Sequence, residues 1–219
     1  MNPEESIADL TVRELLNGVA SREVTPSGGA VAAVGGAAGA ALCEMTCVHT
    51  LAGVDDESGD DADTGDGDPD GRIAELRDSE GELAECRSDL LALADEDVAA
   101  VESLQSAFAA ADAVDDESVQ RAAEHATEVP LETAGACRGV LGAAVVVTDA
   151  GAPNAIPDAG TGASLAHAGL QAGVWTARSN LPLLDDEEFV AEARERGSDL
   201  QTAGANLVDH VAANVRETW

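Results

Sequence analysis

The stretch Thr25-Pro-Ser-Gly-Gly-Ala-Val-Ala-Ala-Val-Gly-Gly-Ala-Ala-Gly-Ala-Ala-Leu-Cys-Glu-Met45 decides the fold of this chain. A Thr-Pro turn and two glycines lead into a helix built almost only of small residues. Small side chains let other helices approach closely, so we expect this helix to lie at the centre of the protein. Its first turn leaves backbone N–H groups without partners inside the helix, a natural site for an anionic ligand atom.

Outward from this stretch the pattern is helical nearly throughout, with no strand alternation of useful length. Pro130 either opens a new helix or kinks an existing one that runs to about residue 148. A second Gly/Ala-rich segment follows a proline-pinned loop at 151–158. The predicted helices cover 6–19, 28–51, 73–114, a segment starting at 115–118, 158–181 and 185–215. We therefore predict one all-α domain over 1–219, a bundle of about six helices with the two Gly/Ala-rich helices near its centre.

Residues 54–71 are rich in aspartate and glycine and are predicted to form a solvated acidic loop. The aspartates suggest an EF-hand, but the ligand spacing does not fit. Counted from Asp61, the twelfth residue is Arg72, where a calcium loop requires glutamate. No metal site is predicted here or at the cysteines, which are expected to be buried and reduced.

The formal net charge is −32, with 43 acidic residues against 11 basic ones, all of them arginine. A disordered acidic chain is excluded, because 45% of the residues are hydrophobic and are arranged periodically. A protein that binds basic partners would not need an excess of acidic residues along its whole chain. We favour a protein that works in concentrated salt, where screening removes the self-repulsion. Dispersed arginines offer no basic face, so nucleic acid is not an expected partner.

No membrane association is expected, although residues 28–43 carry no charge. That run is Gly/Ala-rich and short for a bilayer span. The first residues are acidic where a signal peptide would be basic. The chain is therefore predicted to be cytoplasmic.

Four segments, in order, resemble the signatures of the cyclodeaminase/cyclohydrolase family. That family includes the C-terminal domain of formiminotransferase-cyclodeaminase and stand-alone methenyltetrahydrofolate cyclohydrolases. The segments are Thr25-Pro26-x-Gly28-Gly29-x-Val31-Ala32-Ala33 with its continuation to Met45, Glu85-x-Arg87 through Asp97, Arg121-Ala122 through Leu131, and Pro153-Asn154 through Gly160. The resemblance covers most of residues 5–184 and implies an all-helical homodimer that acts on a one-carbon tetrahydrofolate.

The chain departs from the family pattern in three places. Ser27-Gly28-Gly29-Ala30 stands where Gly-Gly-Gly-Ser is usual, and Pro157 stands where serine is common. The acidic loop replaces a short Lys/Tyr-rich stretch. If that stretch contacts the glutamate tail of folate, this protein must use arginine instead or bind the tail loosely.

The implied reaction is hydrolysis of 5,10-methenyltetrahydrofolate to 10-formyltetrahydrofolate. Its reacting carbon is already cationic, so the enzyme must position a water, remove a proton and protonate the departing nitrogen. A carboxylate can act as that base and also stabilise the cation, and no cofactor beyond the substrate is expected. Asp158 is the first candidate, although its place at a helix start also suits an N-cap. Asp97 is the second candidate, and its alternative is a solvated helix face.

Substrate binding is assigned to polar groups near these carboxylates. Asn154 either contacts the pterin or holds its loop through an Asx turn. Arg87 and Arg121 are candidates for the glutamate carboxylates, with surface ion pairs as the alternative. His167 is interpreted as a structural histidine, and Trp175 is assigned to the core or a dimer interface. The remaining candidates offer hydroxyl and N–H donors at the first helix start, and they are Thr25, Ser27, Gly28 and Gly29.

Two other functions remain open. A formimidoyltetrahydrofolate cyclodeaminase would release ammonia and close the methenyl ring. A non-catalytic helical dimer would bind folate or a partner protein without turnover. The displaced glycine and the missing Lys/Tyr stretch favour this last alternative.

Overall fold

The structure, a computed structural model, describes residues 6–57, 69–111, 113, 114 and 116–218. All regular elements of this part of the chain are helices. They are η1 (Ile7–Asp9), α1 (Val12–Val19), α2 (Gly28–Glu57), α3 (Pro69–Ala110), α4 (Glu117–Ala150), α5 (Ile156–Asn180), η2 (Leu181–Leu183) and α6 (Glu187–Glu217). The predicted all-α bundle of about six helices is confirmed.

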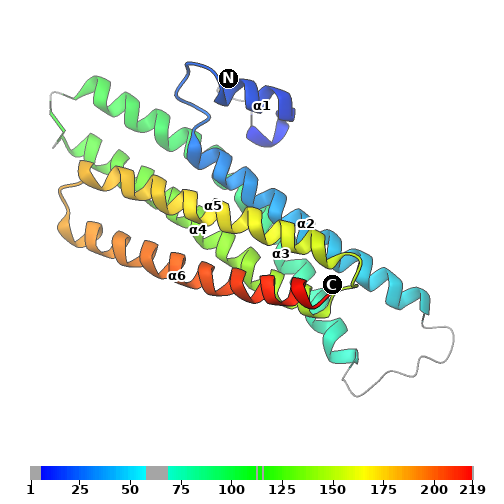
Figure 1. Ribbon diagram of the computed structural model, residues 1–219. Helices are drawn as coiled ribbons and strands as arrows, with labels where there is room; N and C mark the ends of the chain where they lie inside the picture. The colour runs from blue at the N-terminus through cyan, green and yellow to red at the C-terminus, as the bar shows by residue number, and fades with distance from the viewer. Residues whose placement is uncertain (1–5, 58–68, 112, 115, 219) are drawn as a thin grey trace.

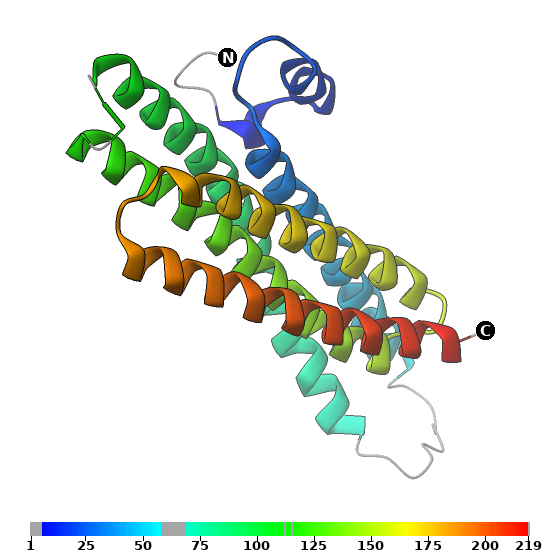
Figure 2. The same ribbon diagram turned by 60° about the vertical axis from the view of Figure 1, so that its left-hand side comes forward.

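The five long helices run side by side along one axis, while α1 stands away from them at the end where α2 begins (Figure 1). Helix α2 packs against α3 and α5, and α4 packs against the same two helices from the other side. Helices α3 and α5 thus occupy diagonal corners of a four-helix arrangement. Helix α6 covers α4 and α5 along their length (Figure 2).

The two Gly/Ala-rich helices touch through their backbones. A Cβ on Gly39 would lie 2.5 Å from the carbonyl oxygen of Gly162, and a Cβ on Gly162 would lie 2.5 Å from the carbonyl oxygen of Gly39. Further along, a Cβ on Gly169 would lie 2.8 Å from the carbonyl oxygen of Ala32. Larger side chains would force α2 and α5 apart, so the small residues of both helices set the distance between them. Each helix also keeps an exposed side, with Val31 on α2 and Trp175 on α5, so neither is enclosed on all sides by the bundle.

The prediction of one continuous helix over 6–19 is wrong. Instead of a continuous helix over 6–19, Leu10 is extended and Thr11 starts a new helix as its N-cap. The hydroxyl of Thr11 accepts a hydrogen bond from the backbone N–H of Glu14, and the Glu14 carboxylate accepts one in return from the Thr11 N–H. This capping box is a local signal that overrides the amphipathic pattern.

Helix α4 passes through Pro130 without being split into two helices. Proline has no N–H, so the carbonyl of Ala126 one turn earlier loses its partner inside the helix. The side-chain amide of Asn180 replaces that partner, with its Nδ2 2.6 Å from the Ala126 oxygen. The buried carbonyl is therefore satisfied, and α4 runs to Ala150.

Both ends of the acidic loop predicted over 54–71 belong to helices. Helix α2 continues to Glu57 and α3 already begins at Pro69. The remainder of the predicted loop, 58–68, lies outside the described residues. Helix α3 also ends at Ala110 rather than near residue 114, and Asp116 caps α4.

Two helices, over Gly28–Val54 and Glu117–Ala150, are long and apolar enough to cross a membrane by length and composition alone. About half of the most apolar window of each is buried inside the bundle. The absence of a membrane partner stays a prediction.

Candidate functional site

The start of α2 is held by a carboxylate from α3. Oδ2 of Asp97 lies 2.9 Å from the hydroxyl of Ser27 and 2.8 Å from the backbone nitrogen of Ala30, both of which donate to it. A carboxyl group therefore does occupy the helix start, whose N–H groups lack partners inside the helix, but the protein itself supplies it.

Asp97 is 2% exposed, so its interpretation as part of a solvated helix face is wrong. Burial raises the pKa of its carboxyl above the usual range, and the hydrogen bonds from Ser27 and Ala30 oppose this shift without cancelling it. A buried carboxyl that retains its proton to higher pH than usual is suited to proton transfer.

The two glycines of the turn have different surroundings. A Cβ on Gly29 would overlap the carboxylate of Asp97, whereas a Cβ on Gly28 would meet nothing within 4 Å. Glycine is thus required at residue 29 so that the Asp97 carboxylate can reach the backbone. At the outer side of the same turn, the hydroxyl of Thr25 donates to Oε1 of Glu102 over 3.2 Å.

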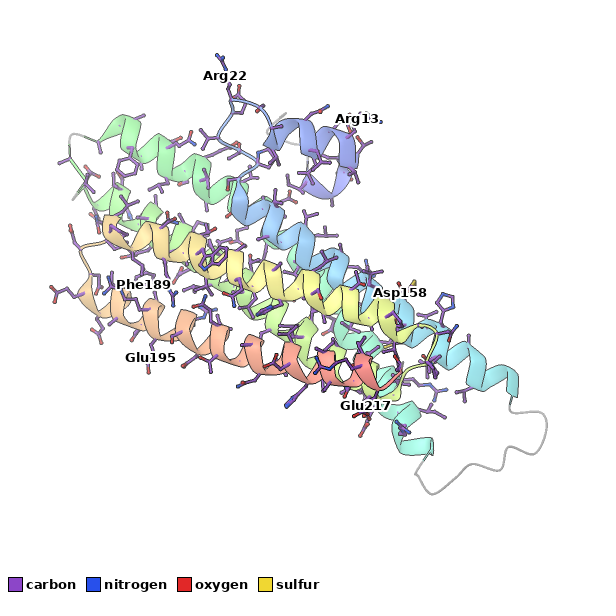
Figure 3. The ribbon with its side chains drawn as sticks, in the orientation of Figure 1. Arg13, Arg22, Asp158, Phe189, Glu195 and Glu217 are labelled. Atoms are coloured by element: carbon purple, nitrogen blue, oxygen red, sulfur yellow. The ribbon has the colours of Figure 1, made fainter. Side chains whose placement is uncertain are left out.

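Asp158 lies in the first turn of α5, beside the end of α6 (Figure 3). It is not the N-cap, because α5 begins two residues earlier than predicted and Ala155 occupies the cap position without a side-chain hydrogen bond. The side chains of Asp158 and Asn154 are exposed. Among the described residues neither side chain makes a hydrogen bond, so the predicted Asx turn of Asn154 is absent and both groups are free to meet a ligand.

The loop before α5 is fixed to α2 by two threonines. The hydroxyl of Thr46 donates to the carbonyl of Ala155 over 3.2 Å, and the hydroxyl of Thr50 accepts from the N–H of Ala152 over 2.9 Å. One turn below, the thiol of Cys43 contacts the carbonyl of Ala159 at 3.6 Å. The position of Asp158 is therefore set by the middle and second half of α2.

The structure divides the predicted site residues into two groups. Thr25, Ser27, Gly28, Gly29 and Asp97 meet at the start of α2, while Asn154 and Asp158 lie at the level of Cys43. Gly29 and Cys43 are separated by fourteen residues of one helix, which is about 20 Å at 1.5 Å per residue. One copy of the chain does not bring the two candidate carboxylates together.

The two predicted folate arginines already have carboxylate partners. Arg87 forms a two-point ion pair with Glu44, with its Nε 2.8 Å and its Nη2 3.2 Å from the two carboxylate oxygens. Arg121 lies 3.6 Å from Glu117 one turn earlier, and both side chains are exposed. Both arginines thus make the ion pairs that were their alternative, and their part in binding folate stays a prediction.

The four thiols are buried or half-buried, and His167 takes part in a side-chain network. Burial raises the pKa of Cys43, Cys47 and Cys137 to about 12, so these thiols stay protonated, and all four cysteines are free. Gln171 links His167 to Gln201 in a side-chain network, with the Gln171 amide nitrogen 3.3 Å from Nε2 of His167. No cluster of three potential metal ligands occurs among the residues that the structure places.

Glu44 and Glu102 are the residues that sequence reasoning missed. Glu44 could have been found, because it is the only charged residue between Gly28 and Val54. Glu102 could not, since α3 carries many acids and only the packing of the Thr25 turn against α3 distinguishes one of them.

Comparisons with known proteins agree with this architecture. The sequence profile described as formiminotransferase-cyclodeaminase matches residues 11–199. A methenyltetrahydrofolate cyclohydrolase of Methylorubrum extorquens is 34% identical over 202 residues, which span 89% of this chain and 91% of that protein. The crystal structure of formiminotetrahydrofolate cyclodeaminase from Thermotoga maritima superimposes with a TM-score of 0.83 at 23% identity, over 97% of this chain and all of that one.

Proposed function

The chain belongs to the formiminotransferase-cyclodeaminase family, and within that family we propose that it hydrolyses 5,10-methenyltetrahydrofolate to 10-formyltetrahydrofolate. The observation that carries the proposal is the match over about nine-tenths of both chains to a protein named for that reaction. The structural neighbour named as a cyclodeaminase is 23% identical and supports the fold alone.

The chemistry needs a carboxylate near a cationic carbon, and the chain offers two. Asp158 is exposed at the start of α5, where it can take a proton from an incoming water and stabilise the positive charge. Asp97 is buried against Ser27 and holds a proton more readily than an ordinary aspartate, so it suits protonation of the departing nitrogen. Hydrolysis of an amidinium needs no metal or redox cofactor.

A homodimer is part of the proposal, because the two carboxylates lie far apart in one copy. The exposed sides of α2 and α5 support it. Between Gly28 and Val54 the one charge, Glu44, is neutralised by Arg87, and α5 carries no charge between Asp158 and Arg178. Exposed or half-exposed apolar residues on these sides, here called the α2–α5 face, are Val31, Ala38, Met45, Leu165, Ala168 and Trp175.

A second copy is the occupant that this face suits. Two chains of charge −32 repel one another wherever their acidic surfaces meet, and that repulsion is low at the α2–α5 face because the exposed apolar residues there carry no charge. An isologous dimer would place the start of α2 of one copy beside the start of α5 of the other, so that the turn that holds Asp97 lies near Asp158 of the second copy. We expect Ala38→Glu to yield monomers without turnover in molar KCl, and Phe108→Glu on α3 to remain dimeric. An active monomer would contradict the shared site.

Adaptation to concentrated salt and a cytoplasmic location complete the proposal. Ion pairs among the described residues involve few of the acids, so most of the 43 carboxylates depend on dissolved ions for screening. The free cysteines suit a reducing compartment.

The deciding experiment follows the absorbance of 5,10-methenyltetrahydrofolate in molar KCl, corrected for spontaneous hydrolysis. Clear acceleration that is lost in low salt supports both the hydrolase and the salt adaptation. If formimidoyltetrahydrofolate is converted with ammonia release instead, the cyclodeaminase is the correct function. Folate binding without any turnover would leave the non-catalytic dimer.

A further inference from the structure

A groove of about 460 Å³ lies between the first turns of α5 and the last turns of α6. Val208, Val211 and Val215 form its apolar bed, and Arg216 stands at one end. Its volume falls within the range of small-molecule sites. The groove is built by close packing of the two helices, since a Cβ on Gly160 would lie 2.8 Å from a methyl carbon of Val215.

The charge of this groove is unusual for the chain. None of its lining residues is acidic, although the protein has 43 acids and 11 arginines. The groove beside α1 contains two glutamates and no arginine, and the groove between α4 and α6 contains three acids and two arginines. The α5–α6 groove is therefore the one of these three whose lining residues carry a net positive charge, which favours an anionic ligand.

The polar side chains of the α5–α6 groove indicate which chemical groups a ligand needs in order to bind there. The hydroxyl of Thr161 donates to the carbonyl of Pro157 over 3.0 Å, and that of Ser164 donates to the carbonyl of Gly160 over 2.9 Å. Both hydroxyl protons are thus used, and the oxygens remain available as acceptors for an N–H group. Arg216 makes no ion pair among the described residues and can donate to a carboxylate.

We propose that this groove holds the aminobenzoyl-glutamate arm of the tetrahydrofolate substrate. The benzoyl ring lies on the three valines, the amide N–H meets the hydroxyl wall, and a glutamate carboxylate binds Arg216. Asp158 follows Pro157 at the rim of the groove, so the one-carbon end of the same molecule reaches the candidate base. This assignment rests on the proposed function and offers Arg216 as a glutamate partner in addition to Arg87 and Arg121, each of which lies beside a carboxylate.

The first test measures binding of N-(4-aminobenzoyl)-L-glutamate itself, in molar KCl, by calorimetry or NMR. We expect Arg216→Gln to weaken binding about tenfold, the value of one charge-assisted contact. Ala212→Leu, which fills the groove, should weaken it as well. Arg194→Gln on the same helix is the control, because Arg194 is exposed, makes no ion pair among the described residues and does not line the groove.

The second test uses turnover. In Arg216→Gln the KM for 5,10-methenyltetrahydrofolate should rise about tenfold with kcat nearly unchanged, as expected when uniform binding is lost. The analogue methenyltetrahydropteroate, which lacks the glutamate, should show the same KM in the wild type and the variant. An unchanged KM for the folate in Arg216→Gln overturns the groove assignment while the function stands. Arg216-dependent binding of the fragment without any turnover supports the groove and overturns the function.

Discussion

Asp97 on α3 accepts a hydrogen bond from the backbone N–H of Ala30, 67 residues earlier in the chain, over 2.8 Å. The contact joins the second and first signature segments and makes a buried carboxyl part of a helix start. Because burial raises the pKa of that carboxyl, its contribution to stability depends on pH.

The first prediction concerns Asp97→Asn. The folded protein holds the Asp97 proton to higher pH than the unfolded chain, whose carboxyl has a pKa near 3.8. The stability contributed by this proton is therefore complete below the unfolded pKa and is lost as pH rises through the folded pKa. Asparagine does not titrate in this range. The free energy of unfolding of Asp97→Asn, measured relative to the wild type, should therefore increase as pH rises. Denaturant unfolding in molar KCl between about pH 4 and 8 measures the difference.

The same variant should lose turnover about 100-fold if Asp97 transfers a proton. Asp89→Asn, an exposed acid on the same helix, serves as the control and should change neither quantity. A stability difference that is independent of pH would contradict the raised pKa.

The second prediction compares two neighbouring glycines. Gly29→Ala places a methyl group against the Asp97 carboxylate, so we expect a loss of about 1–3 kcal/mol of stability and of most of the activity. Gly28→Ala meets nothing within 4 Å and should be neutral or slightly stabilising. Thermal unfolding and turnover of both variants provide the measurement. Equal effects would show that the turn is sensitive to its backbone conformation rather than to Asp97.

The third prediction concerns Asp158→Asn, which should lower kcat by about 100-fold or more while leaving the unfolding transition in place. The side chain is exposed and makes no hydrogen bond among the described residues, so its removal costs the fold little. Asp209→Asn, an exposed acid on α6, controls for the change of charge. Near-normal kcat in Asp158→Asn would exclude Asp158 as the base.

The fourth prediction tests how α4 tolerates Pro130. Asn180→Ala leaves the carbonyl of Ala126 without a donor, which should cost about 1–3 kcal/mol. In the Pro130→Ala background the restored N–H can bond that carbonyl, so the same change should cost less. A double-mutant cycle of unfolding free energies gives the coupling. Additive effects would mean that Asn180 does not compensate for the proline.

The fifth prediction links the thiols to salt. In molar KCl an Ellman-type reagent should not react with Cys43, Cys47 or Cys137, because burial and a pKa of about 12 keep them protonated and covered. Cys86 is partly exposed and should react first. In low salt we expect all four to react, as self-repulsion loosens the bundle. Full protection without salt would contradict the salt dependence.

Several features of the protein could be read from local patterns. The Gly/Ala composition of 28–51 and 158–181 predicted two central helices, because only small residues let helix backbones touch, as Gly39 and Gly162 do. The starts of α1 and α5 were harder to predict. The capping box of Thr11 sets the start of α1, and the proline after Ile156 favours the start of α5, and both signals compete with the apolar periodicity.

The sequence by itself determined the all-α class, the close contact of the two Gly/Ala-rich helices, the family and the two candidate carboxylates, because these depend on composition and on short ordered motifs. Only the tertiary structure decided what surrounds each residue. It buried Asp97 against Ser27, left Asp158 exposed and paired Arg87 with Glu44. It also placed Arg216 beside the valines without an ion pair among the described residues. These outcomes depend on which helix faces meet across long sequence separations, and in a chain with 43 acids no local pattern distinguishes the one that packing will bury.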